Sequence, residues 1–406
     1  MKPSVRLIAL LASLTAFVPF SIDTYLPSLP QIAIDLSSTT AQVQHTISAF
    51  LAGLCLGMLF YGPLSDRYGR RPLLLGSLVL YGLATLGCLF SGTIEQLTAW
   101  RFLQALGGAG ALVIARAVAR DLFGLAQVAK VMSWMHLLTM MATLVAPMVG
   151  TWLVLIDGWR TIFAALFVLC ALCLLMVSVG LNESLTVQAR GTSLKRAFAA
   201  YPSILQQPRA VALILCMALA FGGTFAFITA SPFVYVVYFG VSPRTFSWLF
   251  GLNILGIIVV SFINARWVTR FGPQRMLGVG AVLAGAAGLA LMVAGYTQWG
   301  GLTSLVLCLV LYMSVTGLLG ANCAASLMTM FPTQAGASVA LCISVQFASG
   351  ALASLWVSHL ADGSPWPMCL VVGSCGIGCL IAYGIATRTP ADPVAAPEEL
   401  SVPFQP

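Results

Sequence analysis

The segment LIALLASLTAFVPFSIDTYLPSL, from Leu7 to Leu29, is almost wholly apolar and contains one charged residue, Asp23. At a rise of about 1.5 Å per residue, an α-helix of this length crosses the ~30 Å hydrocarbon core of a lipid bilayer. A charge at that depth raises the free energy of insertion by roughly 3 kcal/mol or more. The segment therefore predicts a membrane-spanning helix, and Asp23 is a candidate functional residue within it.

The rest of the chain has the same character, because 60% of its residues are hydrophobic and 7% are charged. A soluble domain has about 25% charged residues, so the composition indicates a polytopic membrane protein. The long unbroken apolar runs favour helices over the short alternating strands of a membrane barrel. Hydropathy predicts twelve spans, near residues 7–29, 44–64, 73–91, 97–119, 131–154, 161–181, 208–234, 245–265, 275–296, 301–330, 335–358 and 367–387.

The basic residues indicate the orientation of these spans. Of the 19 Lys and Arg residues, all but Arg101, Arg160 and Arg244 fall on one side of the predicted membrane. The positive-inside rule places that side, with both termini, in the cytoplasm. We therefore attribute the net charge of +8 to membrane topology and expect no nucleic-acid partner. The N-terminal apolar run is too long for a signal peptide and lacks an A-x-A cleavage site, so we expect it to remain.

The chain divides into two similar halves. The string SDRYGRRPLL (Ser65–Leu74) aligns with VTRFGPQRML (Val268–Leu277), and each follows the second predicted span of its half. We predict an all-α membrane protein with two pseudo-symmetric bundles of six helices and a transport site between them. The predicted parts are a first bundle over 1–184, a cytoplasmic linker over 185–207, a second bundle over 208–390 and a disordered tail over 391–406.

The loop GPLSDRYGRRP, between the second and third predicted spans, concentrates charge and turn residues. By composition alone it is a cytoplasmic anchor. A glycine in it allows a tight reversal of the chain, and the final proline suits the first turn of the next helix. Its candidate functional residues are Gly62, Asp66, Arg67, Gly69, Arg70 and Arg71.

This loop resembles the signature G-x-L-a-D-r-x-G-r-r of the major facilitator superfamily. RFLQALGGAG, from Arg101, resembles the R-x-x-q-G motif of that superfamily. LVAPMVGTWL resembles its antiporter motif through Pro147 and Gly150, with Ala146 and Thr151 in place of glycines. Together with SIDTYLPSLP, ARDLF and GWRTIF, these strings are similar to the Bcr/CflA family of bacterial drug:proton antiporters.

The resemblance implies the twelve-helix fold, a bacterial cytoplasmic membrane, and export of bicyclomycin, phenicols or other compounds by alternating access. It implies a conformational latch in which Arg70 pairs with Asp121 and Asp66 faces a helix N-terminus in the other half. The second copy of the loop has Thr269 in place of Asp66, so we expect an asymmetric latch. The resemblance also implies that Arg101 takes part in proton coupling.

Asp23 and Arg101 lie at similar predicted depths on antiparallel spans, so we expect them to face one cavity and to offset each other's desolvation. We interpret Asp23 as the protonation site, because burial and a nearby guanidinium act on a carboxylic acid in opposite directions. In this hypothesis a proton and the substrate exclude each other from the site. The alternative is a structural salt bridge or a helix-end cap.

The cavity wall is less specific. Its candidates in the first half are Tyr25 and Gln104. In the second half they are Phe225, Tyr312, Asn322 and Gln346, with Phe221 and Phe227 as further aromatics. Aromatic and uncharged polar groups suit amphipathic compounds, although each residue also fits ordinary helix packing. Because no acidic residue lies within the second-half spans, we expect neutral or zwitterionic substrates.

Other classes fit less well. A proton symporter that imports a metabolite shares the fold and remains the alternative. Catalytic motifs, zinc spacings and phosphate-binding loops are absent from the sequence, which argues against an enzyme or an ATP-driven pump. We expect no cofactor and no metal, with the proton gradient as the energy source. The expected partners are small-molecule drugs, protons and the lipid bilayer, and the expected assembly is a monomer. The eleven cysteines, including Cys170 and Cys173, fit packing within spans.

Overall fold

A computed structural model describes residues 5–123, 125–185 and 194–389, and this part of the chain is built from helices. The predicted tail and residues 186–193 of the predicted linker lie outside the described residues. The helical segments are α1 (Val5–Asp23), η1 (Leu26–Ser28), α2 (Leu29–Asp35), α3 (Thr40–Tyr68), α4 (Arg70–Leu89), α5 (Ile94–Leu122), α6 (Leu125–Asp157), α7 (Arg160–Gly180), α8 (Leu194–Leu205), α9 (Pro208–Pro232), η3 (Phe233–Tyr238), α10 (Pro243–Phe271), α11 (Pro273–Thr297), α12 (Gly301–Met330), η4 (Pro332–Gln334), α13 (Ala335–His359) and α14 (Trp366–Arg388).

Twelve segments in the described residues are long and apolar enough to cross a membrane, which confirms the predicted number of spans. Most of their ends lie within a few residues of the predicted ones. The largest differences are at the ends of two spans: the first continues through η1 and α2 to Asp35, and the eighth continues to Phe271. Asp23 therefore lies nearer the middle of its span than the sequence indicated.

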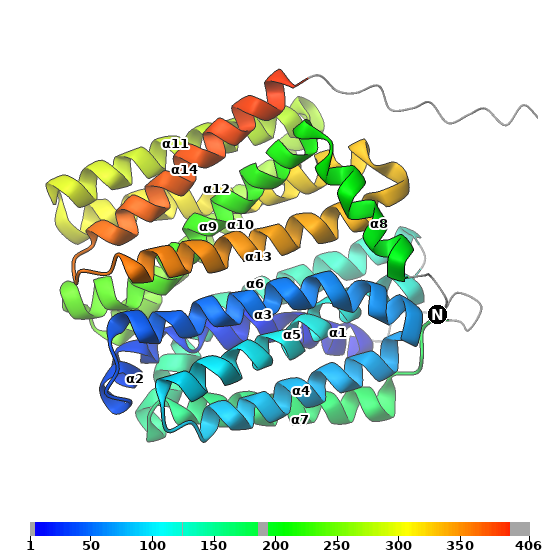
Figure 1. Cartoon of the computed structure of the whole chain (residues 1–406), viewed down its shortest axis with the longest axis horizontal. Helices are drawn as coiled ribbons and strands as arrows, with labels where there is room; N and C mark the ends of the chain where they lie inside the picture. The colour runs from blue at the N-terminus through cyan, green and yellow to red at the C-terminus, as the bar shows by residue number, and fades with distance from the viewer. Residues whose placement is uncertain (1–4, 124, 186–193, 390–406) are drawn as a thin grey trace, which may run out of the picture.

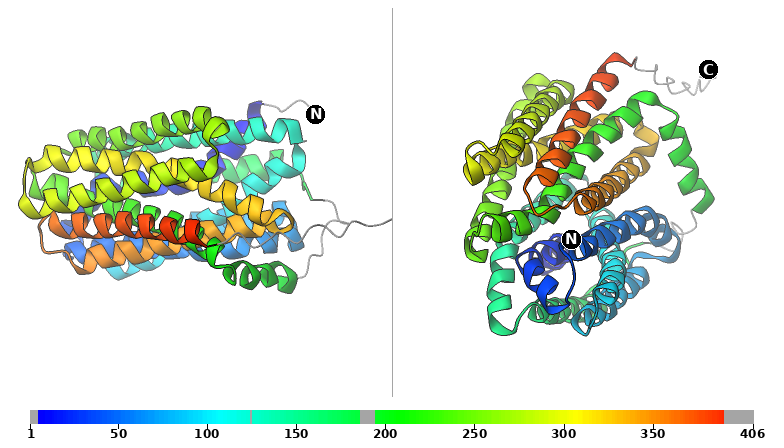
Figure 2. Two further views of the ribbon diagram at one scale, coloured as in Figure 1. Left: turned by 90° about the horizontal axis from the view of Figure 1, so that it is seen from above. Right: turned by 60° about the vertical axis from the view of Figure 1, so that its left-hand side comes forward.

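The helices form two bundles. α1–α7 pack mainly on one another, as do α9–α14, and α3 of the first bundle runs beside α13 of the second (Figure 1). The short helix α8 lies at one end of the molecule, and α2 lies at the opposite end (Figures 1 and 2). We call these the α8 end and the α2 end. One continuous apolar cluster includes residues of both bundles, such as Ile22, Leu51 and Phe225.

The two bundles repeat local geometry as well as sequence. Gly69 ends α3 with a φ of +99°, and Gly272 ends α10 with a φ of +80°, both in a region that favours glycine. The preceding cations also correspond, because Arg67 lies over the ring of Tyr68 at 5.3 Å and Arg270 over that of Phe271 at 5.7 Å. These matches support the internal repeat.

Proline explains where the first span is interrupted. α1 ends at Asp23, and Pro27 and Pro30 are the second residues of the short helices η1 and α2. A proline lacks a backbone N–H, so it starts a helix readily and cannot continue one without losing a hydrogen bond. The chain turns through Thr24 and Tyr25 instead, and this places Asp23 at a break within the membrane-spanning segment.

Candidate functional site

The Asp23 side chain is buried without a partner. It is 4% exposed, and within the described residues its carboxylate makes no hydrogen bond and no ion pair. Its oxygens are not among the fully enclosed polar atoms, so they still reach accessible space. A buried carboxylate in this state is unusual, because buried charges are normally paired.

Arg101 is fully buried on α5 and is held by aromatic rings and carbonyl groups. Its Cζ lies 4.2 Å from the centre of the Phe50 ring and 4.5 Å from that of Tyr25. Its Nη1 donates to the backbone oxygen of Ser21 at 3.2 Å and to Oε1 of Gln104 at 2.7 Å. Two further guanidinium nitrogens, Nε and Nη2, are enclosed without a hydrogen-bond partner.

The expected ion pair between Asp23 and Arg101 is therefore absent from this structure, and that prediction is wrong for this conformation. The ion pairs among the described residues both involve Arg70 instead. Arg101 contacts Ser21 and Tyr25, each two positions from Asp23. Arg101 is thus held by residues that flank Asp23, without an ion pair to the Asp23 carboxylate.

Tyr25 and Gln104 hold Arg101 in place. The Tyr25 hydroxyl lies 3.0 Å from that of Thr46, and Nε2 of Gln104 donates to Oγ1 of Thr85 at 2.9 Å. Both side chains are fully buried. In this conformation they position the guanidinium and do not line an open cavity.

Gly150 on α6 packs directly on the helix break beside Asp23. A Cβ atom built on Gly150 would lie 2.0 Å from the backbone oxygen of Thr24 and 2.7 Å from its carbonyl carbon. Every real side chain is excluded at such distances unless the backbone moves. The antiporter-like segment therefore supports the backbone that follows Asp23.

The same segment of α6 contacts the second bundle. Ser247 of α10 donates to the backbone oxygen of Pro147 at 3.1 Å, and its hydroxyl lies 2.9 Å from that of Thr151. Thr151, which stands where the motif has glycine, thus supplies an interaction between the bundles. One stretch of α6 connects the Asp23 break to the other half of the molecule.

A second connection between the bundles lies on α3 and α13. Ser48 donates to Ser354 at 2.7 Å, and Ser354 also lies 2.7 Å from the Thr229 hydroxyl on α9. Like the Ser247 interactions, these lie toward the α2 end. These side-chain hydrogen bonds between the bundles thus lie near the α2 end.

The latch residues cluster at the turn between α3 and α4. The expected pair is present, since Nε of Arg70 lies 3.0 Å from Oδ2 of Asp121, and Asp66 adds a second contact to Arg70 at 2.6 Å. Asp66 does not contact the second bundle through any hydrogen bond or ion pair of the described residues, contrary to expectation. Arg67 is exposed, and no atom would crowd a side chain at Gly62.

Glu183, which follows α7, is not among the residues predicted from the sequence. Its carboxylate accepts hydrogen bonds from the backbone N–H groups of Arg70 at 2.9 Å and Arg71 at 3.3 Å. These N–H groups open α4, where a negative charge is favoured. Arg71 also donates to the backbone oxygen of Ser178 at 2.6 Å. No local pattern identifies such a pairing, because the partners are far apart in the chain.

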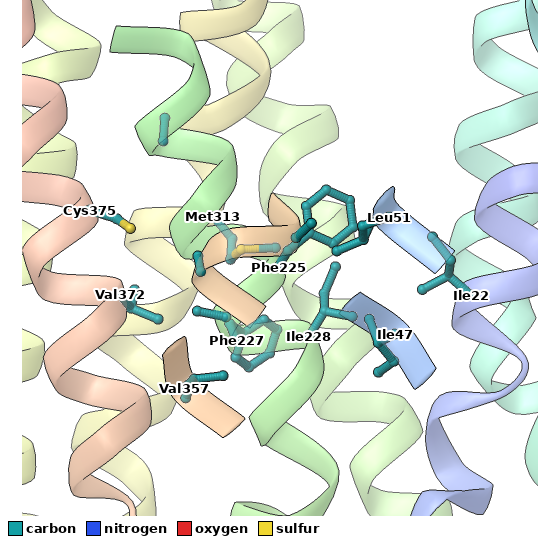
Figure 3. Packing of buried hydrophobic residues seen from close by; sticks show 14 of the residues in the cluster. Ile22, Ile47, Leu51, Phe225, Phe227, Ile228, Met313, Val357, Val372 and Cys375 are labelled. Carbon is teal, nitrogen blue, oxygen red and sulfur yellow. The ribbon is translucent and has the colours of Figure 1, made fainter. Parts of the chain in front are cut away.

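Phe225 and Gln346 remain candidates for a cavity wall. Figure 3 shows Phe225 of α9 directed toward Leu51 of α3, with Ile22 of α1 nearby, so this ring lies between the bundles. Gln346 is buried on α13, and its amide makes no hydrogen bond with the described residues. Its polar atoms are not fully enclosed and thus remain reachable.

Tyr312 and Asn322 have packing roles within the second bundle instead. The Tyr312 hydroxyl donates to the backbone oxygen of Ala220 at 3.0 Å, and Nδ2 of Asn322 donates to Oδ1 of Asn264 at 2.9 Å. Tyr312 also occupies the space that a side chain at Gly223 would need. The Tyr312 hydroxyl is used within the bundle, so Tyr312 does not line an open cavity in this conformation. Oδ1 of Asn322 makes no hydrogen bond with the described residues and is not enclosed, so its place in the cavity wall stays a prediction.

We expect Arg101→Lys to destabilise the protein by roughly 2 kcal/mol or more, because an ammonium cannot stack on two rings and bond Gln104 in one geometry. Thermal unfolding of the purified protein in detergent measures this change. The matched control is Arg67→Lys at an exposed arginine, where little change is expected. Equal melting temperatures for the two variants would contradict the structural role assigned to Arg101.

Comparison with known proteins agrees with this architecture. The sequence pattern of the Major Facilitator Superfamily matches residues 11–242 and again 213–406. A "Bicyclomycin resistance protein homolog" of Haemophilus influenzae is 31% identical over 388 residues, which cover 95% of this chain and 97% of the relative. "Multidrug resistance protein MdtL" of Salmonella typhimurium is 29% identical over 282 residues, covering 70% of this chain and 71% of that protein.

Solved structures show the same fold at low sequence identity. The crystal structure of a D-xylose-proton symporter superposes with a TM-score of 0.74 at 18% identity, covering 96% of this chain and 99% of that one. A peptide transporter in complex with sulfate gives 0.75 at 15% identity and covers 94% of each chain. With two superfamily matches, twelve spans and a bicyclomycin-resistance relative at this coverage, the chain belongs to the Major Facilitator Superfamily and, within it, to the Bcr/CflA group.

Proposed function

We propose that this protein is a proton-coupled exporter of neutral or amphipathic small molecules, of phenicol or bicyclomycin type, and that it works by alternating access as an antiporter. The observation that carries the proposal is the buried, unpartnered Asp23 at a helix break that packs on Gly150. The names of the bicyclomycin-resistance and multidrug-resistance relatives support drug export. We place the α8 end in the cytoplasm of a bacterium, because the basic loops predict it.

Asp23 is suited to exchange a proton because its ionised and neutral forms differ greatly in free energy in this surrounding. An ionised carboxylate without a partner in an apolar surrounding is disfavoured by several kcal/mol, whereas a neutral acid is tolerated. We therefore take Asp23 as protonated in this conformation. A rearrangement that brings water, substrate or a guanidinium to the carboxylate favours release of that proton.

The contacts of α6 provide a route from this site to the other bundle. Ionisation at Asp23 changes the packing of the break at Thr24, which rests on Gly150. The same stretch of α6 bonds Ser247 of α10 through Pro147 and Thr151. A shift at the break thus reaches the Ser247 contacts, which are one of the two sets of hydrogen bonds that connect the bundles at the α2 end. Such contacts are the elements that alternate in rocking-bundle transport.

Neutral substrates follow from the charges available. Asp23 is the one acid well inside a span in the first half, and the spans of the second half contain no Asp or Glu. A substrate with several positive charges would have one carboxylate as its counter-charge, so an uncharged body with hydrogen-bonding groups fits this site better. Hydroxyl and amide groups on an apolar body meet this requirement.

Transport by everted membrane vesicles tests the proposal. With an acidic interior, an antiporter accumulates chloramphenicol or bicyclomycin inside the vesicle, and collapse of the pH gradient releases it. The alternative symporter accumulates its substrate only when the exterior is the acidic side. Accumulation under the second condition alone would overturn the proposed direction.

A further inference from the structure

A separate cavity of about 300 Å³ lies at the α2 end, between the two bundles. The start of α3 forms one wall, and the end of α9, η3, the end of α13 and the start of α14 form the rest. Its polar lining includes Thr39, Thr40, Gln44 and Ser364, and its apolar lining includes Phe233 and Val357. The volume is at the lower limit for sites that bind small molecules.

Gln44 distinguishes this cavity from a gap in the packing. Its side chain lines the cavity and is 2% exposed, and its Oε1 is enclosed without a hydrogen-bond partner. Its Nε2 also makes no hydrogen bond with the described residues, but this atom is not enclosed and reaches accessible space. A buried amide oxygen nearly always has a donor in a folded protein. A half-turn of the amide exchanges its oxygen and nitrogen, so the group offers an incoming molecule either an acceptor or a donor.

The backbone around the cavity is also unusual. Phe233, Val234 and Val237 line it from η3, a π-helical segment that follows Pro232. π-Helical turns are rare and occur frequently at functional sites. The hydroxyls of Ser48, Ser354 and Thr229 lie within one helical turn of lining residues and join α3, α13 and α9 there.

The lining contains no charged side chain. Asp362 belongs to the adjacent loop, but its carboxylate accepts a hydrogen bond from the backbone N–H of Ser364 at 2.8 Å and is not part of the wall. A phosphate or ammonium group would have no counter-charge there. The lining therefore favours an uncharged molecule with an apolar body and hydrogen-bonding groups.

We propose that this cavity is a second binding site for a neutral, amphipathic small molecule, with Gln44 as the group that recognises its amide or hydroxyl. Because the walls come from both bundles, an occupant holds them together at the α2 end. We expect excess compound at this end to slow the transport cycle. The inference relies on the proposed function only for its probe, chloramphenicol, a neutral compound with hydroxyl and amide groups.

Equilibrium binding of chloramphenicol to the purified full-length protein tests the site. We expect two sites in the wild type. Gln44→Leu keeps the side-chain size but removes the polar group, and we expect it to weaken one site roughly ten-fold. Ala41→Leu fills the cavity from the partly exposed first turn of α3 and should remove that site without unfolding the chain.

The control is Gln346→Leu, which removes the amide near the proposed transport cavity and should leave the second site unchanged. Uphill transport at low compound concentration should persist in Gln44→Leu, and inhibition by excess compound should need about ten-fold more compound. A wild type with one site would overturn the inference, as would unchanged binding in both Gln44→Leu and Ala41→Leu. A wild type that shows no uphill transport would instead refute the proposed function. The two failures are therefore distinguishable.

Discussion

Asp23→Asn abolishes uphill transport but preserves downhill exchange of substrate. The amide has nearly the shape of the acid and cannot release a proton, so the coupling is lost while the fold and the route remain. We expect accumulation in everted vesicles to fall to the level seen without a pH gradient, a change of at least about ten-fold if coupling supplies 1.4 kcal/mol or more. Counterflow of labelled chloramphenicol at equal pH measures the exchange that remains.

The matched control for this prediction is Asp157→Asn, which neutralises an exposed acid at the end of α6. It should accumulate substrate as the wild type does. Because Asp23 has no partner in this conformation, we also expect the variant to be at least as thermostable as the wild type. Uphill transport by Asp23→Asn would show that the coupling group lies elsewhere.

Gly150→Ala is the second substitution with a large expected effect. The added methyl group would meet the Thr24 carbonyl at 2.0 Å, and a backbone atom cannot move aside as a flexible side chain does. Overpacking of this kind typically costs 1–3 kcal/mol, so the melting temperature should fall. We expect transport to fall by roughly ten-fold or more, because the shifted backbone lies next to Asp23 and to the contacts with α10.

Gly76→Ala provides the comparison for that measurement. It adds the same methyl group inside helix α4, where nothing lies within 4 Å of the new atom. Its transport and melting temperature should match those of the wild type. Equal behaviour of the two alanine variants would mean that α6 does not support the Asp23 break in the working protein.

The sequence predicts best what depends on local composition. Hydropathy finds all twelve spans, because a bilayer demands long apolar helices. The pairing of Arg70 with Asp121 was predictable because the loop GPLSDRYGRRP resembles the superfamily signature in which this pair occurs. Gly69 and Gly272 mark the same turn in both halves, and both adopt a positive φ.

The sequence does not predict on which side of a helix a buried side chain lies, or which residues far apart in the chain come into contact. Depth along a helix follows from counting residues, but the side on which Asp23 and Arg101 point depends on how α1 and α5 are rotated. Tyr312 looks like a cavity residue until its hydrogen bond to Ala220 within the second bundle is known. Glu183 and Gln44 have no local signal, because their roles arise from helices that meet only in the folded protein.

Proton release on substrate binding is the measurement that tests the central claim most directly. Chloramphenicol is added to purified protein in weak buffer near neutral pH with an indicator dye, for the wild type and for Asp23→Asn. The compound is uncharged, so released protons come from the protein. We predict release by the wild type and none by the variant, at matched binding. Equal release per bound molecule in both proteins would contradict the claim that proton and substrate compete at Asp23.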